Sequence, residues 1–221
     1  MACRYGFNCL RYDCWFEHPQ GRGIDTLPVA PAASTARQKN AQVLIMRNDT
    51  GNFHVLLQLR HWAMPVMPGH LAAVGGMRDR TDIDSSFTAV REVFEETGLL
   101  DVGHMPAAGA NLRAKARERG SLIPQTFCKF GEGAQVDWWL LLLSGPGTFE
   151  TAEDGWKECA DISTLLPSLP GAQLAPCFGH AWLPANRINE IPESVQLMGG
   201  LQRRVREALD VLGASSVRQF H

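Results

Sequence analysis

The pattern of hydrophobic and polar positions predicts a globular region that begins near residue 41. The segments "AQVLIMR" and "FHVLLQLR" are rich in apolar and β-branched residues, and the turn "NDTGN" between them predicts a hairpin. We expect "HLAAVGG" to form a short strand that runs into a loop. Farther along, "LIPQTFCKF" and "VDWWLLLLSG" predict two more strands, and the leucine run of the second indicates burial on both faces.

Helices are predicted between and after these strands. Asp84 is placed to cap a helix that starts near Ser85 and ends at Thr97, where Gly98 supplies a stop. The stretch "DISTLLPSL" predicts a short helix. A C-terminal helix is predicted by four apolar residues at a spacing of four, although two glycines weaken its start. These apolar residues are Leu197, Leu201, Val205 and Leu209, and the glycines are Gly199 and Gly200.

Composition divides the chain into three parts. Residues 1–20 are rich in cysteine and aromatic residues, residues 21–40 form a linker of Gly, Pro, Ala and Ser, and residues 41–221 form the main domain. With 221 residues and 45% hydrophobic content, the chain has globular composition. The net charge of −2 predicts no global attraction to nucleic acid. Lacking a secretory signal or a long apolar run, the protein is expected in the cytoplasm or nucleus and not to be secreted.

The segment "REVFEETGLL", residues 91 to 100, places three glutamates on one helix face. At 100° per residue, Glu92, Glu95 and Glu96 fall within an arc of about 100°. Like charges at this spacing repel by roughly 0.2 to 0.5 kcal/mol per pair, so another group must neutralise them. Arg91 can pair with Glu95, which leaves Glu92 and Glu96 less compensated. Carboxylate oxygens in this geometry suit Mg²⁺ or Mn²⁺, although a solvated charged face would show the same pattern.

A glycine turn precedes this helix, and the two together resemble a known motif. "GGMRDRTDIDSSFTAV" runs from Gly75 and Gly76 through an acidic loop, and glycines let the backbone approach a metal or a phosphate closely. The unit resembles the Nudix box, G-x5-E-x7-R-E-U-x-E-E-x-G-U, where U is aliphatic. "REVFEETGL" fits its second half at every position. Asp82 takes the acidic position of the first half, and eight residues separate it from Arg91, one more than the standard.

The resemblance covers about residues 41 to 165 and implies an α+β fold, the Nudix α/β/α sandwich with a mixed sheet. It implies that Glu92, Glu95 and Glu96 hold Mg²⁺ or Mn²⁺, that Arg91 orients them, and that the backbone near Gly76 contributes. The implied reaction is attack of water on a diphosphate linkage.

A general base must take a proton from that water. In many Nudix enzymes the base is a glutamate of the box or of a later loop. Here the loop candidates are Glu150 and Glu153 in "GTFETAEDGW", with Asp154 behind them. These residues could equally belong to a solvated loop with no catalytic role. Asp82 is expected to be a loop or capping residue rather than a metal ligand.

The one-residue expansion of the box also resembles the coenzyme A diphosphatase branch of Nudix enzymes. The segment before the box keeps that branch's spacing from Arg60 to Gly69 and on to Gly75. Pro65, however, stands where the branch carries a basic residue, and Ala73-Val74 replaces its aromatic or leucine followed by proline. These departures argue against coenzyme A itself.

Three tryptophans are candidates for contact with a substrate. Trp138 and Trp139 are adjacent on a predicted strand, so one should face the core and the other the opposite face. Trp139 could stack on a base, as could Trp62 in a loop that should border the site, and packing of both strand tryptophans in the core is the alternative. His180 has no partner in the sequence pattern and is expected to be structural.

The N-terminal cysteines have the spacing of a metal site. Cys3, Cys9, Cys14 and His18 supply four ligands within sixteen residues, which fits tetrahedral Zn²⁺. In zinc-finger peptides the metal contributes on the order of 10 to 16 kcal/mol, far more than so short a segment could gain by packing. The remaining cysteines show no ligand spacing and are expected to be buried free thiols: Cys128, Cys159 and Cys177.

This segment resembles the CCCH zinc fingers, which commonly bind single-stranded RNA. The resemblance implies that exposed rings stack on bases while arginines meet phosphates, although some rings must cover the metal's own small core. The candidate rings are Tyr5, Phe7, Tyr12, Trp15 and Phe16, and the candidate cations are Arg4, Arg11 and Arg22.

We therefore expect a Mg²⁺-dependent hydrolase that cleaves a nucleoside diphosphate linked to another group, such as a capped or nucleotide-ended RNA, and is associated with RNA through the finger. Two alternatives stay open. One is a small-molecule diphosphatase of coenzyme A or dinucleotide type, and the other is an inactive RNA-binding adaptor. Nudix enzymes often pair, so a homodimer is a further candidate state, for which the sequence identifies no interface.

Overall fold

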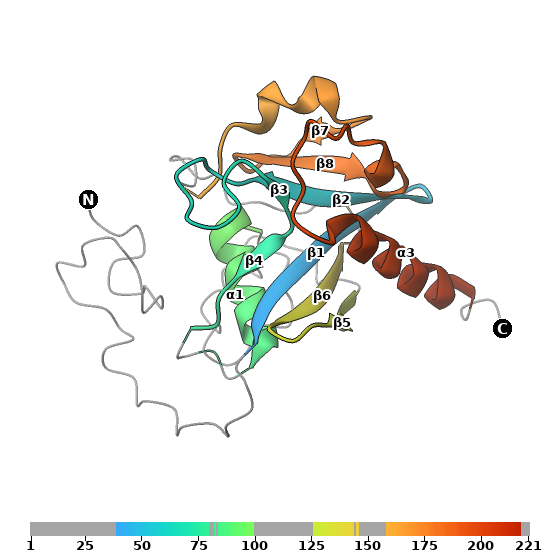
Figure 1. Ribbon diagram of the computed structural model, residues 1–221. Coiled ribbons are helices and arrows are strands. Elements are labelled where there is room, and N and C mark those ends of the chain that lie inside the picture. Colours follow the sequence, from blue (N-terminus) through green and yellow to red (C-terminus); the bar gives the residue numbers. More distant parts are fainter. Residues whose placement is uncertain are drawn as a thin grey trace.

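A computed structural model describes residues 39–79, 82, 84–99, 126–143, 145 and 158–217 of the chain. The zinc finger predicted at residues 1–20 lies outside the described residues, as do nearly all of the linker and the base candidates Glu150 and Glu153. The described residues form a mixed α+β structure built on one sheet (Figure 1).

The sheet has eight strands, whose central order is β5-β6-β1-β2-β8-β7, with β3 paired to β2 and β4 paired to β1. β1 and β6 are parallel and every other pair is antiparallel, so the sheet is mixed. The strands are β1 (Asn40–Asp49), β2 (Asn52–Leu59), β3 (Leu71–Ala72), β4 (Val74–Gly76), β5 (Thr126–Glu132), β6 (Val136–Leu143), β7 (Gln173–Leu174) and β8 (His180–Pro184). The helices are α1 (Ser85–Thr97) and α3 (Leu201–Val217), with 3-10 helices η4 (Ile162–Thr164), η5 (Leu166–Ser168) and η6 (Ala185–Glu190).

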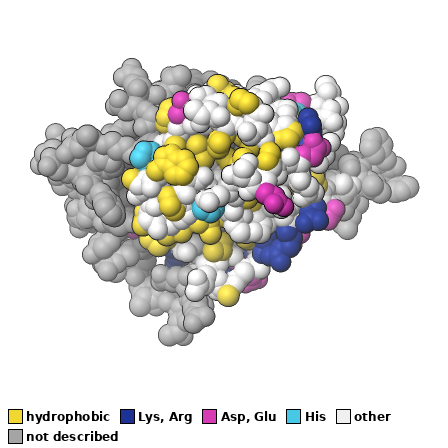
Figure 2. All heavy atoms as spheres, turned by 45° about the horizontal axis from the view of Figure 1, so that its top comes forward, with side chains coloured by type: hydrophobic (Ala, Val, Ile, Leu, Met, Phe, Trp, Pro, Cys, Tyr) yellow, Lys and Arg dark blue, Asp and Glu magenta, His cyan; other side chains and the backbone are white. Residues whose placement is uncertain are grey.

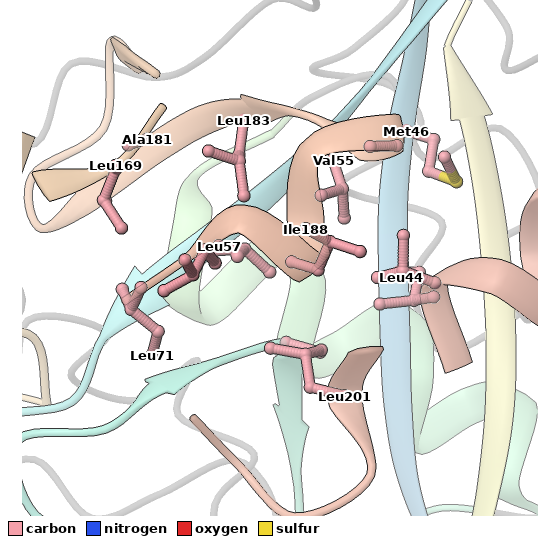
Figure 3. Close-up of a cluster of buried hydrophobic side chains, with 14 of the residues drawn as sticks. Leu44, Met46, Val55, Leu57, Leu71, Leu169, Ala181, Leu183, Ile188 and Leu201 are labelled. Carbon is pink, nitrogen blue, oxygen red and sulfur yellow. The ribbon is translucent and has the colours of Figure 1, made fainter. Parts of the chain in front are cut away.

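Helices cover both faces of the sheet (Figure 1). Side chains alternate along β1, so they enter two different cores, one under the helices of each face. Leu44 and Met46 belong to the larger core, which α3 and η6 complete, and Val43 and Ile45 belong to the smaller core against α1. Figure 3 shows side chains of the larger core from β1, β2, β8, η6 and α3 turned toward one another. The layers are therefore helix, sheet and helix, as the sequence predicts.

The hairpin predicted at "NDTGN" is confirmed. β1 and β2 pair antiparallel with Asp49 opposite Asn52, so Thr50 and Gly51 form a two-residue turn. Their φ angles are 51° and 92°, and positive φ at both positions defines the type I′ turn that suits strand twist. The amide of Gly51 donates to Asn48 Oδ1 at 2.8 Å. Thr50 carries the strain, since a β-branched residue rarely adopts positive φ.

The two adjacent tryptophans face opposite sides of the sheet, as predicted from their place on one strand. Trp138 packs in the larger core, where the guanidinium of Arg204 lies 5.4 Å from its ring centroid. Trp139 lies on the α1 side and stacks on Phe127 with ring centroids 5.0 Å apart. Trp139 therefore has an aromatic neighbour within the fold.

The C-terminal helix begins later than its apolar spacing predicts. α3 starts at Leu201, after the glycine pair at 199 and 200, so Leu197 does not belong to it. Leu197 instead forms an isolated parallel bridge with Leu71. Leu201 and Val205 are buried as predicted, while Leu209 is only partly buried.

Two smaller expectations are refined by the structure. "DISTLLPSL" forms two 3-10 turns, η4 and η5, with Pro167 near the start of the second. Among the described cysteines, Cys159 and Cys177 are buried free thiols as expected, and Cys128 is a partly buried one. The described helices include none that is long and apolar enough to cross a membrane.

We predict that Thr50→Asn stabilises the protein by about 1 kcal/mol, because Asn tolerates the positive φ of a type I′ turn better than Thr does. The free energy of unfolding in urea is the measurement, and Thr164→Asn, in η4 and outside the left-handed region, is the matched control. A Thr50→Asn variant no more stable than the parent chain would show that the positive φ of Thr50 does not strain the turn.

Candidate functional site

Caps at both ends fix the position of α1. The Asp84 carboxylate accepts hydrogen bonds from the amides of Ser86 and Phe87 at 2.8 and 3.2 Å. At the other end Gly98 has φ of 66°, and its amide donates to the carbonyl of Phe94 at 2.8 Å. The helix predicted from Ser85 to Thr97 is thereby confirmed, and its register determines where each glutamate points.

The acidic face of α1 is buried rather than solvated. Glu92 is 2% exposed, Glu95 9% and Glu96 4%. The reading of these glutamates as a solvated charged face is therefore wrong. Carboxylates pay a large desolvation cost when buried, so the surrounding groups must compensate their charge.

Arg91 compensates part of this charge. Its Nη1 donates to Glu92 Oε1 at 2.7 Å and to Glu95 Oε2 at 3.1 Å. Its Nη2 donates to Asp82 Oδ2 at 2.8 Å and to the carbonyl of Met77 at 2.9 Å. The predicted pair with Glu95 is present, but the expectation that Glu92 is less compensated than Glu95 is wrong, since Arg91 also bonds Glu92 at the shorter distance.

Burial alone would lower the pKa of Arg91, but the charges of its carboxylate partners outweigh that effect. Glu92, Asp82 and Glu95 together hold the pKa of the guanidinium above its usual value. Arg91 is therefore a permanent cation at the centre of the acidic cluster.

Asp82 closes the loop that precedes the helix. Its carboxylate accepts hydrogen bonds from the amide of Asp79 at 2.8 Å and from the hydroxyl of Thr88 at 3.0 Å, besides those of Arg91. The carbonyl of Asp82 accepts from Arg78 at 2.6 and 2.8 Å. These contacts give Asp82 the loop-fixing role expected of it.

Glu96 has a different set of partners from the other two glutamates. Its Oε2 accepts hydrogen bonds from the Gly75 amide at 2.9 Å and from Gln58 Nε2 at 3.1 Å. Gln58 Nε2 also donates to the carbonyl of Ala73 at 3.3 Å, and Gln58 Oε1 accepts from Cys159 Sγ at 3.1 Å. A buried chain from Cys159 through Gln58 therefore fixes one oxygen of Glu96.

The pKa of Glu96 is raised well above its usual value. Burial is the largest cause, and the charges of Glu92 and Glu158 add to it, against the Gly75 amide and the charge of Arg60. Burial and the neighbouring charges therefore make Glu96 bind a proton more readily than an ordinary glutamate does.

The glycine turn lies directly against the glutamates. A Cβ on Gly76 would come within 2.6 Å of Glu92 Oε1, and one on Gly75 would collide with the carbonyl of Ala41. Gly75 also has a φ of 146°, which side-chain-bearing residues rarely adopt. Gly76 therefore lets the backbone approach Glu92 closely, as the sequence motif implies, and Gly75 lets β4 pack against β1.

The donor set fits a hard divalent cation. Four buried carboxylates share this corner with the guanidinium of Arg91, and oxygen-only ligands are those that Mg²⁺ and Mn²⁺ prefer. Within the part of the chain that the structure describes, no three His, Cys, Asp or Glu side chains are already arranged to hold a metal ion. The carboxylates here turn toward Arg91, Gly75 and Gln58 instead.

Sequence reasoning assigned no role in the site to Gln58, Arg60, Cys159 or Glu158. Gln58 is 1% exposed, and a lone polar residue within the apolar strand "FHVLLQL" was the signal that could have found it. Of the tryptophan candidates, Trp62 lines a cavity of about 860 Å³ and Trp139 does not. The N-terminal ligands and RNA-binding candidates lie outside the described residues.

The structure resembles those of Nudix proteins. RenU, a Nudix hydrolase from M. smegmatis, is 19% identical with a TM-score of 0.46, and the match covers 81% of this chain and 88% of that one. A mutT/nudix family protein from Listeria innocua is 14% identical with a TM-score of 0.49, covering 83% and 98% of the two chains. The NUDIX domain of Shewanella oneidensis NrtR, complexed with ADP ribose, is 14% identical with a TM-score of 0.45, covering 83% and 93%. Likeness at this level does not establish what this chain acts on.

Sequence comparison gives a different result. No protein-family profile matches the chain. Over 171 residues, or 74% of its length, the chain is 26% identical to bifunctional glutamine synthetase adenylyltransferase/adenylyl-removing enzymes of Bifidobacterium longum strains. The chain spans about 15% of the length of these relatives, so their activity is not carried over to it.

The raised pKa of Glu96 predicts a pH dependence of stability. Because the folded pKa lies above the usual value of 4.5, the folded state binds this proton more tightly than the unfolded state. The resulting stability is complete below about pH 4.5 and is lost as the pH rises through the folded pKa. In chelator, Glu96→Gln should therefore be more stable than the parent chain at pH 8, and the difference should shrink toward pH 4.

Urea unfolding at both pH values measures this difference, and Asp210→Asn, an exposed carboxylate on α3, serves as the control. A Glu96→Gln variant that loses stability equally at both pH values would contradict a raised pKa of Glu96 in the folded state.

Proposed function

We propose that this chain is a Nudix-type hydrolase that uses a divalent cation to cleave a diphosphate linkage in a nucleoside diphosphate joined to another group. The observation that carries the proposal is the buried acidic face of α1 against the Gly75–Gly76 turn. Burying Asp82, Glu92, Glu95 and Glu96 together carries a large desolvation cost, for which a purely structural role gives no evident reason. A site that binds a cation and its phosphate ligand accounts for that cost.

Glu92, Glu95 and Glu96 would hold Mg²⁺ or Mn²⁺ through their carboxylate oxygens. When bound, the cation would offset the negative charge of the phosphates and lower the pKa of a coordinated water. Arg91 orients Glu92 and Glu95 through its donated hydrogen bonds, and Gly75 and Gln58 hold Oε2 of Glu96 in place. These fixed positions reduce the reorganisation needed during reaction.

The chain's own carboxylates would also move the proton of the attacking water. The charge of Glu158 helps to raise the pKa of Glu96, and a carboxylate with a raised pKa is a stronger base toward the attacking water. We propose that Glu96 and Glu158 share this role. Glu150 and Glu153 stay candidates from the sequence.

The N-terminal segment would direct the enzyme to RNA. The spacing of Cys3, Cys9, Cys14 and His18 supports a zinc site, and the surrounding rings and arginines support contact with single-stranded RNA. A capped or nucleotide-ended RNA would join both parts of the chain in one substrate. A homodimer stays a proposal without an identified interface.

We predict that the chain hydrolyses at least one member of a panel in the presence of Mg²⁺: capped RNA, NAD-ended RNA, a dinucleoside polyphosphate, ADP-ribose and coenzyme A. Glu96→Gln should lower kcat by about 100-fold or more, because both cation binding and proton transfer depend on that carboxylate. Asp210→Asn should leave kcat unchanged. Released phosphate products, resolved by chromatography, are the measurement.

If the chain hydrolyses no member of this panel but still binds RNA, the hydrolase proposal is rejected and the alternative of an inactive RNA-binding adaptor is supported. Turnover of coenzyme A or dinucleotides alone would instead support a small-molecule diphosphatase in which the finger is a tether.

We predict that Cys14→Ser, which removes a zinc ligand, raises KM for an RNA-linked diphosphate by about 10-fold, since phosphate contacts and base stacking from the finger are lost. Hydrolysis of small nucleotides should not change. Steady-state kinetics on both substrate types measure the effect, and an equal loss on both would show that the finger does not act through RNA.

A further inference from the structure

The structure contains a cavity near the end of β2 that the catalytic proposal does not use. Its volume is about 860 Å³, within the range typical of small-molecule sites. Loops after β2, before β8 and before α3 form it, and its walls include both apolar and polar side chains. Figure 2 shows hydrophobic side chains gathered beside histidines on the face that includes the top of Figure 1.

Trp62 is the most prominent side chain of this cavity. It is 69% exposed, although exposing an indole forgoes the free energy that burying it would provide. Its ring rests against Gly69, where any Cβ would collide with it, and Gly69 has a φ of 68°. A glycine thus supports one part of the indole while much of its surface stays open to a ligand.

Phe178 is a second exposed ring that lines the cavity, 44% accessible, and it too has a rigid support. Its carbonyl lies 2.8 Å from Nδ1 of the buried His180. The next residue, Gly179, packs so tightly on Cys159 that a Cβ would collide with the Cys159 side chain. The loop that holds Phe178 is therefore fixed against the same cysteine that bonds Gln58.

A short path leads from the cavity to the acidic cluster. Cys159 lines the cavity and donates to Gln58, which donates to Glu96. Arg60 follows Gln58 by two residues, pairs with Cys159 in an isolated bridge, and donates from Nε to the carbonyl of Val66 at 3.1 Å. Its positive charge lowers the pKa of both Glu96 and Cys159, against the larger effect of burial.

The remaining wall offers polar groups suited to a heterocycle. His61 Nδ1 accepts a hydrogen bond from the amide of Ala63 at 3.1 Å, so in the neutral ring Nε2 carries the proton and can donate. Asp161, Ser194 and Gln196 add further donors and acceptors to the lining. A ring with hydrogen-bonding edges matches this combination better than an aliphatic chain does.

We propose that this cavity binds the base of a nucleotide by stacking on Trp62 and Phe178, with Arg60 receiving a phosphate between the base and the acidic cluster. This inference rests on the proposed function, since it names the substrate group that the site would recognise. It assigns base recognition to the catalytic domain itself, separate from the N-terminal finger.

The test compares AMP with ribose 5-phosphate, two probes that differ only in the base, by calorimetric titration of the full chain without divalent ions. The parent chain should bind AMP more tightly. Trp62→Ala should weaken AMP binding by about 5- to 150-fold, the range expected for loss of one base stack, and should leave ribose 5-phosphate unaffected. Trp62→Phe should retain most of the affinity, and Leu174→Ala, at another exposed apolar residue outside the cavity, should not alter it.

Arg60→Gln should weaken both probes by a similar factor, because both carry the phosphate. AMP binding no tighter than that of ribose 5-phosphate, in a chain that hydrolyses diphosphates, would overturn the cavity proposal and leave the proposed function intact. AMP binding that depends on Trp62, in a chain that hydrolyses none of the panel, would support the binding site and reject the hydrolase.

Discussion

The site depends on one buried guanidinium. Arg91 joins Asp82 in the loop, Glu92 and Glu95 on the helix and the carbonyl of Met77 after the glycine turn. A planar group with five donors can satisfy several acceptors at fixed angles, which an ammonium on a flexible stem cannot do. Arg91 therefore determines the loop conformation and the orientation of two glutamates at the same time. Removing it would leave several carboxylates buried together without their shared cation.

Much of this arrangement is predictable from sequence because it is local. The caps at Asp84 and Gly98, the helix between them and the type I′ hairpin each follow from residues a few positions apart. The wheel also places the three glutamates on one face, but it does not show whether that face is buried. Burial depends on the glycine turn of β4, which reaches the helix only once β4 has paired with β1.

The parts that the sequence does not reveal are those assembled from distant segments. Gln58 contacts Glu96, 38 residues away, and Cys159, 101 residues away. Hydrophobic periodicity carries no information about such pairs, although a buried polar residue in an apolar strand indicates that a partner must exist. Leu197 shows the same limit of periodicity. Its spacing fits the helix, but the helix begins only after the two glycines that follow it.

The end of β2 connects the two halves of the proposed site. Side chains alternate along a strand, so Gln58 points to the α1 side and bonds Glu96 while Leu57 and Leu59 enter the larger core. Arg60, whose charge lowers the pKa of Glu96, follows directly after the strand. The loop that follows then delivers Trp62 to the cavity. Phosphate chemistry and base recognition would therefore share one strand, and a shift in its register would disturb both together.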